Sequence, residues 1–304
     1  MQPPQSLDLL SPADVAQVRR LVDRVVVADG VGPMSEHVLL HLPAGGDPGV
    51  RHLVVRDGDR IVGYAHLDVT DQVEGSSAEL AVDPAARRAG VGRALVERLV
   101  QESPDGRLRL WAHGEHPAAA ALADHLGFAR TRVLLQMRRS LDAPLPEVRL
   151  PDGVVVRTFV VGRDEDAWLG VNARAFASHP EQGKWGRAEL ELRLGEPWFD
   201  AAGFFLAERD GVLVGFHWTK VHGSDSGEAH GHEPVGEVYV VGVDPSEQGR
   251  GLGPALTLLG LHSLHDRGLH EVLLYVDESN TAAVTTYERL GFAVWATDVC
   301  FSRG

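Results

Sequence analysis

The sequence predicts an α/β protein that contains one fold twice, each copy a mixed, twisted sheet flanked by helices. The first observation behind this prediction is an internal duplication, because residues 53–67 resemble residues 204–218. Each stretch is two β-rich runs joined at an Arg-Asp-Gly turn, which is typical of a hairpin. The second observation is a strand that enters a glycine-containing turn and then a helix, in residues 79–100 and again in residues 238–261.

The two copies keep a nearly constant spacing along the chain. Asp83 and Asp244, each in a Val-Asp-Pro sequence at the end of a junction strand, are 161 positions apart. Phe128 and Phe292, each in a Leu-Gly-Phe sequence, are 164 positions apart. So small a drift indicates that both halves run helix, hairpin, strand, helix, strand, helix, strand.

Short sequence patterns predict the first helix of each half, two further strands and the boundary between the halves. Ser11 and Asp14 suit the start of a first helix, and the second half opens with a similar helical pattern in residues 165–177. Strands are predicted after the junction helices, in residues 108–113 and 271–276. A segment with three prolines is the best linker candidate. The predicted division is residues 1–141, a linker at 142–153, and residues 154–304.

Composition limits the class of protein. The 304 residues are 44% hydrophobic and 24% charged, which is typical of a soluble globular chain. No apolar run approaches the roughly 20 residues that span a bilayer, and no secretory signal pattern is visible at the start. Cys300 is the single cysteine, so an internal disulfide framework and a cysteine-based zinc site are excluded. We therefore expect a cytoplasmic protein.

The net charge of −14 argues against nucleic acid or an anionic membrane as the main partner, because both select basic surfaces. An acidic protein can attract cationic ligands such as amines. Solubility alone also explains an acidic chain, so both interpretations stay open. We expect a monomer, because the duplication already supplies an internal pair.

The junction in the second half is predicted to bind a pyrophosphate. Residues 248–253 place several free backbone N–H groups at a helix N-terminus, where the helix dipole adds partial positive charge and glycine allows close approach. No Gly-Lys-Ser/Thr follows, and Leu256 stands where a dinucleotide fingerprint needs its third glycine. A tight turn without a ligand is the alternative.

These residues resemble the GNAT superfamily of acyl-CoA-dependent N-acyltransferases. Gln/Arg-x-x-Gly-x-Gly/Ala, its acetyl-CoA motif, occurs at residues 248–253 and 87–92, and residues 280–292 match the signature of its C-terminal helix. The resemblance implies two tandem GNAT domains and acetyl-CoA as cosubstrate. The positions implied to bind it are Val241, Gly242, Val243, Gln248, Gly249, Arg250, Gly251, Leu252, Gly253, Asn280 and Ala283 in the second half, and Leu80, Ala81, Val82, Arg88, Ala89, Gly90, Val91, Gly92 and Arg93 in the first.

The resemblance also implies catalytic roles. A carboxylate near Glu237 commonly serves as general base in GNAT enzymes, and Tyr287 is the natural acid, since a phenol with a pKa near 10 is protonated at neutral pH. Backbone N–H groups of residues 241–243 are implied to bind the thioester, and Gly242 fits a local irregularity in this strand. The alternatives are an ordinary strand carboxylate and a core tyrosine.

The first half is not equivalent to the second. Alignment on the Leu-Gly-Phe sequences places His116 where Asn280 stands and Ala123 where Tyr287 stands. The matched glutamate is also absent. We therefore expect the first half to keep a CoA cradle without catalysing the reaction.

Several short stretches, "FHWTK", "HPEQG", "LLYV" and "SNTAAVTTY" among them, resemble the mycothiol synthase family over essentially the whole chain. That resemblance implies acetylation of the cysteinyl amine of cysteinyl-glucosaminyl-inositol. The implied acceptor residues are Glu36, Glu181, Lys220, Glu237 and Tyr275. Other acceptors (an aminoglycoside, a polyamine or a peptide N-terminus) and a non-catalytic CoA-binding module remain alternatives.

The loop at residues 222–236 is longer than the expected turn and is rich in histidine. Its His222, His230 and His232 lie beside Glu228 and Glu233, and a His-x-His pair can bind metal. The glycine and serine content favours a solvated loop instead, so no metal is expected. A covalent acyl-enzyme on the single cysteine is not expected either, because direct transfer needs no protein nucleophile.

Overall fold

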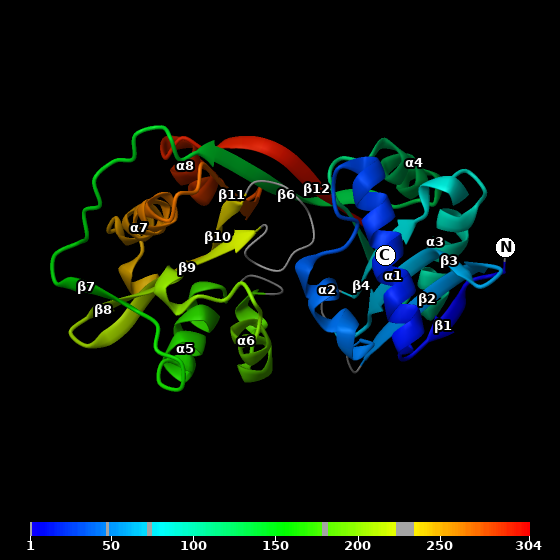
Figure 1. Ribbon diagram of the computed structural model, residues 1–304, viewed down its shortest axis with the longest axis horizontal. Coiled ribbons are helices and arrows are strands. Elements are labelled where there is room, and N and C mark those ends of the chain that lie inside the picture. The colour runs from blue at the N-terminus through cyan, green and yellow to red at the C-terminus, as the bar shows by residue number, and fades with distance from the viewer. Residues whose placement is uncertain (1, 47–48, 72–74, 178–181, 223–233) are drawn as a thin grey trace. The chain divides into compact units, whose positions relative to one another are not determined.

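The computed structural model describes residues 2–46, 49–71, 75–177, 182–222 and 234–304 (Figure 1). They form two compact units: unit 1 is Met1–Leu134 with Ala296–Gly304, and unit 2 is Leu135–Trp295. Among the described residues, no helix combines the length and the apolar character that crossing a membrane requires.

Unit 1 is a mixed sheet with helices on both faces. Its strands lie in the order β1-β2-β3-β4-β5-β12, in which β4 is parallel to β5 and the other neighbouring pairs are antiparallel. Its elements are β1 (Gln5–Leu7), α1 (Pro12–Asp29), α2 (Glu36–His41), β2 (Val50–Asp57), β3 (Arg60–Asp68), β4 (Ser76–Val82), α3 (Val91–Glu102), β5 (Leu108–Ala112), α4 (Pro117–His125), the start of β6 (Ala129–Ser140) and the end of β12 (Ala293–Arg303).

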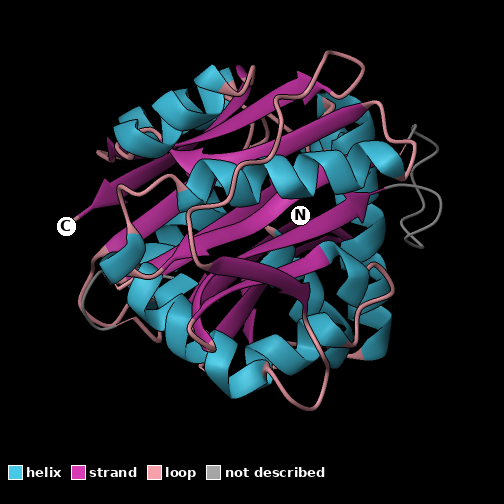
Figure 2. Cartoon of the chain, turned by 90° about the vertical axis from the view of Figure 1, so that its left-hand side faces the viewer, coloured by secondary structure: helices cyan, strands magenta, loops and turns pink. Residues whose placement is uncertain are grey.

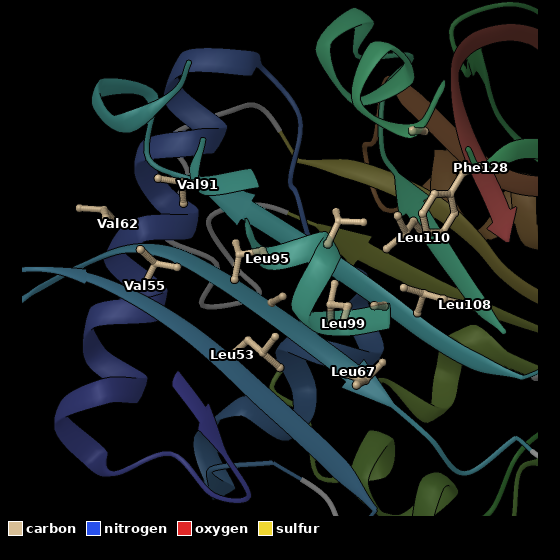
Figure 3. Close-up of a cluster of buried hydrophobic side chains, with 14 residues drawn as sticks. Leu53, Val55, Val62, Leu67, Val91, Leu95, Leu99, Leu108, Leu110 and Phe128 are labelled. Carbon is tan, nitrogen blue, oxygen red and sulfur yellow. The ribbon is translucent and has the colours of Figure 1, made fainter. Parts of the chain in front are cut away.

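Alternation along the strands builds two cores in unit 1, one on each face of the sheet. Leu95 and Leu99 of α3 are fully buried against leucines of β2, β3 and β5 (Figure 3). On the other face, Leu21 of α1 packs with Val54 and Tyr64, whose positions alternate with those of the first core. The predicted start of α1 is confirmed, because the Ser11 hydroxyl accepts from the Asp14 N–H at 3.2 Å.

Unit 2 repeats this plan with a more aromatic core. Its strands follow the order β6-β11-β10-β9-β8-β7, with β10 parallel to β11. Helices pack against the strands (Figure 2). Trp168, Phe204 and Trp218 are fully buried on the face that α5 covers, while Leu252 and Leu256 of α7 pack on the opposite face. Its elements are β7 (Val154–Thr158), α5 (Glu165–Ala175), α6 (Arg187–Leu194), β8 (Phe204–Arg209), β9 (Val212–His222), β10 (Val235–Val243), α7 (Leu252–Asp266), β11 (Glu271–Asp277) and α8 (Thr281–Arg289).

The predicted fold class, two α/β units that each combine parallel and antiparallel strands with flanking helices, is therefore confirmed. At the C-terminal end of the chain, the boundary between the compact units differs from the boundary predicted from the sequence repeat. Residues 296–304 belong to unit 1 because Val299–Arg303 of β12 pair with β5. Residues 142–153 contain no helix or strand. The division into 1–141 and 154–304 stays a prediction about the repeat.

Candidate active site

Strand β10 leaves its parallel neighbour partway along its length. Its pairing with β11 covers only Gly236, Glu237 and Val238 in the described part of the chain, while its pairing with β9 continues to Val243. One edge of residues 239–243 thus presents backbone N–H and C=O groups without a strand partner. Such groups are available to a ligand.

A bulge lies beside this divergence. The register between β9 and β10 shifts between Val238 and Val240, so Tyr239 is the extra residue. The prediction of an irregularity at Gly242 was wrong, because Gly242 pairs in register with Phe216. A Cβ at Gly242 would lie 2.6 Å from the Phe216 ring, so close packing explains this glycine.

The turn after β10 has the geometry of an anion cradle. Gly251 is the N-cap of α7 with a φ of 85°, and Gly249 has a φ of 76°. No atom lies within 4 Å of a Cβ built at either position, so both face open space. The side chain of Gln248 donates to the Val243 carbonyl at 3.2 Å and ties the turn to the strand. Backbone N–H groups at this helix N-terminus can hold a pyrophosphate.

Unit 1 builds the same turn. Gly90 is the N-cap of α3 with a φ of 86° and open space around its Cβ position. Arg87 Nε donates to the Val82 carbonyl at 3.3 Å, as Gln248 does in unit 2, and its guanidinium also binds both carboxylate oxygens of Asp29. Arg88 takes the left-handed conformation that Gly249 takes in unit 2, with a φ of 63°.

Glu237 is a buried carboxylate at the point where β10 departs. It is 6% exposed, and its Oε2 lies 2.7 Å from Nε2 of His222. Lys220, directly opposite on β9, is 4% exposed, and its ammonium lies 4.7 Å from the centre of the Trp198 ring. His222 is the residue of this site that sequence reasoning assigned to the loop instead. Only the cross-strand register could have revealed it.

Tyr287 lies on α8, whose start is fixed by Asn280. The Asn280 side chain caps the helix by accepting from the Ala283 N–H at 3.2 Å. Burial raises the pKa of Tyr287 to about 12, and its ring meets Phe292 edge-on at 5.8 Å. Among the described residues, its hydroxyl makes no hydrogen bond.

The remaining predicted acceptor residues are distributed as follows. Tyr275 is exposed on β11, and its hydroxyl accepts from Gln136 Nε2 at 2.8 Å. Glu36 begins α2 in unit 1, and its predicted reach to the acceptor stays a prediction. Glu181 lies outside the described residues, as do His230, His232, Glu228 and Glu233.

Two further residue classes concern metal binding and covalent catalysis. No group of three or more His, Cys, Asp or Glu residues there could hold a metal ion. Cys300 is buried in unit 1, and burial raises the pKa of its thiol. A protonated buried thiol is a poor nucleophile.

Unit 1 does contain a buried carboxylate at its diverging strands, which sequence reasoning missed. Ser77 of unit 1 is the position equivalent to Glu237 of unit 2, because Ser77 pairs with Asp68 as Glu237 pairs with Lys220. Glu79 lies two residues after Ser77 on the same strand. Glu79 is the last residue of β4 that pairs with β5, and its Oε2 accepts from the Ser35 N–H at 2.5 Å. The first half therefore lacks the matched glutamate but carries a carboxylate on the same face.

Glu79 is held in an ion cluster. Nε2 of His113 lies 3.6 Å from the Glu79 carboxylate, and Nδ1 lies 3.0 Å from Asp298 on β12. Burial alone would lower the pKa of His113, but its hydrogen bond to Asp298 and the negative charge of Glu79 nearby raise it to about 10. Burial raises the pKa of Glu79, yet the bonds from His113 and Ser35 leave it below its ordinary value. An imidazolium-bound carboxylate is a weak proton acceptor.

Comparison with known proteins connects this geometry to a family. Residues 172–292 match the Acetyltransferase (GNAT) family, and residues 48–130 match the Acetyltransferase (GNAT) domain. Mycothiol acetyltransferase of Acidothermus cellulolyticus is 59% identical over 97% of this chain and 93% of its own length. Mycothiol acetyltransferase of Streptosporangium roseum is 52% identical over 97% of each chain.

Solved structures agree on the fold. A GCN5-related N-acetyltransferase from Sphaerobacter thermophilus, 28% identical, has a TM-score of 0.69 over 99% of this chain and 95% of its own. A tandem GNAT protein from the clavulanic acid biosynthesis pathway, 20% identical, has a TM-score of 0.73 over 99% and 98%. At that identity the second likeness shows the fold alone.

The ion cluster predicts how stability depends on pH. His113 has a folded pKa above its ordinary 6.5, so its contribution is complete below that value and is lost as pH rises toward about 10. His113→Gln should therefore flatten the decline of the free energy of unfolding between pH 6.5 and 10, measured by urea titration. His125→Gln, at an exposed position on α4, is the control. An unchanged slope in His113→Gln would contradict the assignment.

Proposed function

The chain belongs to the mycothiol acetyltransferase family of GNAT proteins, and we propose that it transfers the acetyl group of acetyl-CoA to the cysteinyl amine of cysteinyl-glucosaminyl-inositol, giving mycothiol and CoA. The observation that carries this proposal is the identity of 52–59% with mycothiol acetyltransferases over nearly the whole chain. The geometry of unit 2 supports it, because a buried carboxylate, an open cradle and a diverging strand lie together there.

The binding of acetyl-CoA is proposed from the shape of the turn and the strand edge. The open space beside Gly249 and Gly251 and the N-terminus of α7 suit the pyrophosphate. The unpaired edge of residues 241–243 suits the pantetheine amides and the thioester carbonyl, whose oxygen gains negative charge during attack. The equivalent turn of unit 1 at residues 88–93 suits a second CoA.

Glu237 is proposed to accept the proton of the cysteinyl ammonium, which leaves the amine free to attack the thioester carbonyl. His222 holds this carboxylate at 2.7 Å, and its side chain is more exposed than that of Glu237. The proton can therefore pass through His222 toward solvent. Lys220 lies opposite Glu237 in the register of β9 with β10, and its ammonium packs against the Trp198 ring.

Tyr287 is proposed to assist the departure of the CoA thiolate. With a pKa of about 12, the phenol keeps its proton throughout the neutral range. A thiol has an ordinary pKa of about 8.5, so full transfer of this proton to the sulfur is uphill. Tyr287 thus acts first as a hydrogen-bond donor that stabilises negative charge on sulfur as the carbon–sulfur bond breaks. The thiolate then takes up the second proton that the attacking nitrogen loses, which gives the amide and CoA.

The direct test is to incubate the purified protein with acetyl-CoA and synthetic cysteinyl-glucosaminyl-inositol and to identify the product by mass spectrometry. Acetylation on the cysteinyl nitrogen supports the proposal. A thiol-colour assay would mislead, because the acceptor itself carries a thiol. Binding of acetyl-CoA without product would contradict the acceptor, and a panel of aminoglycosides, polyamines and peptides would then identify the amine.

Substitution of the base should give a pH-dependent defect. Glu237→Gln is expected to lower turnover by about 10² to 10⁴-fold at low pH, where the amine is protonated and needs a base. The deficit should shrink above pH of about 8, the ordinary pKa of an α-amine. The readout is the pH–rate profile, with Glu288→Gln on the exposed surface of α8 as control. A deficit that is constant with pH would remove Glu237 as the base.

Substitution of the phenol should separate chemistry from binding. Tyr287→Phe keeps the edge-on ring contact with Phe292 and removes only the hydroxyl. We expect turnover to fall by about 10²-fold or more with the acetyl-CoA dissociation constant unchanged. Steady-state kinetics and calorimetry measure the two quantities. Unchanged turnover would exclude Tyr287 from the reaction.

A further inference from the structure

Unit 2 carries an exposed tryptophan that the proposed chemistry does not use. Trp295 on β12 is 64% exposed, although tryptophan is one of the most costly side chains to leave in water. The guanidinium of Arg138 lies 4.6 Å from the ring centre and covers one face of the indole. A flat aromatic surface held by a cation is a rigid platform for a ligand.

Alternation places this platform on the same face of the sheet as the proposed base. Glu237 pairs in parallel register with Leu273, so the two side chains share a face. Glu271 and Tyr275 lie two residues on either side of Leu273 and therefore share that face as well. Arg138, which covers Trp295, also binds Glu271 at 3.1 Å. Strand register and these contacts therefore place Glu237 and Trp295 on the same face of the sheet.

Hydrogen-bonding side chains lie beside the rings of Trp295 and Tyr275. The side chain of Gln136 fixes the Tyr275 hydroxyl at 2.8 Å, and Tyr275 is itself 46% exposed. The Arg138–Glu271 pair adds a charged donor and a charged acceptor beside the indole. Rings rimmed by hydrogen-bonding groups suit a polyol ring, whose C–H groups pack on an aromatic face while its hydroxyls bind at the rim.

We propose that Trp295 and Tyr275, with Arg138, Gln136 and Glu271, form the subsite for the sugar and cyclitol rings of the acceptor. This inference rests on the proposed function and extends it, because Trp295 would determine which amines are accepted. The span across the sheet agrees: β12, β6, β11 and β10 are successive strands, so three strand spacings, about 14 Å, separate the strand of Trp295 from the strand of Glu237. A cysteinyl group followed by two six-membered rings has a similar length.

The test compares Trp295→Ala with Val294→Ala. Val294 is the adjacent exposed residue of β12, and alternation turns its side chain to the other face of the sheet. Two substrates are used with each variant: the full acceptor, and cysteinamide, which has the reactive amine but no rings. Saturation-transfer NMR with glucosaminyl-inositol alone reports ring binding without any reaction.

We expect Trp295→Ala to raise the KM for the full acceptor by at least about tenfold, equivalent to about 1.4 kcal/mol. The kinetics with cysteinamide and the KM for acetyl-CoA should stay unchanged, and the saturation-transfer signal should disappear. Val294→Ala should behave as the unsubstituted protein. Retention of the NMR signal in Trp295→Ala, or an equal loss on both substrates, would overturn the subsite.

The outcomes separate the two proposals. If the unsubstituted protein acetylates the full acceptor but glucosaminyl-inositol gives no saturation transfer, the platform is wrong and the proposed function stands. If it acetylates neither substrate, the proposed function fails. If Trp295→Ala changes the sedimentation velocity of the protein instead of its KM, the tryptophan serves self-association and the subsite is overturned.

Discussion

The departure of β10 from β11 after Val238 is the constraint on which the rest of the site depends. It leaves a strand edge whose backbone groups have no partner in the sheet, and such groups need a ligand or water to satisfy them. The bulge at Tyr239 lies at the same point. Glu237 occupies the last paired stretch, so its carboxylate lies where the strand opens. The turn with Gly251 then follows at the end of the same strand.

Both units contain a strand that leaves its parallel neighbour and ends in a glycine turn. They differ in the charged groups around the buried carboxylate of that strand. In unit 1, the imidazolium of His113 and the Ser35 N–H bind Glu79, which holds the pKa of this carboxyl low. In unit 2, Glu237 contacts a histidine that is open to solvent. Both units keep the cradle, and in unit 1 a buried ion cluster that includes Asp298 holds the carboxylate.

The sequence predicted what depends on neighbours along the chain. The hairpins, the turn at Gly251 and the helix start at Ser11 all have signals within a few residues, and they were correct. Contacts across the sheet had no such signal, so the bond of His222 to Glu237 and the cluster around His113 were missed. The interpretation of Gly242 failed for the same reason, since the Phe216 ring that excludes a side chain comes from another strand.

We propose that unit 2 performs the reaction, and a comparison of Gly251→Asp with Gly90→Asp tests this division of roles. Both glycines are helix N-caps with nearly the same φ and open space, so the two substitutions impose the same backbone strain and the same carboxylate on a phosphate site. The rate of acetylation of the amine acceptor is measured for each. We expect Gly251→Asp to lose most turnover and Gly90→Asp to keep it. The reverse order, or equal loss in two folded variants, would contradict it.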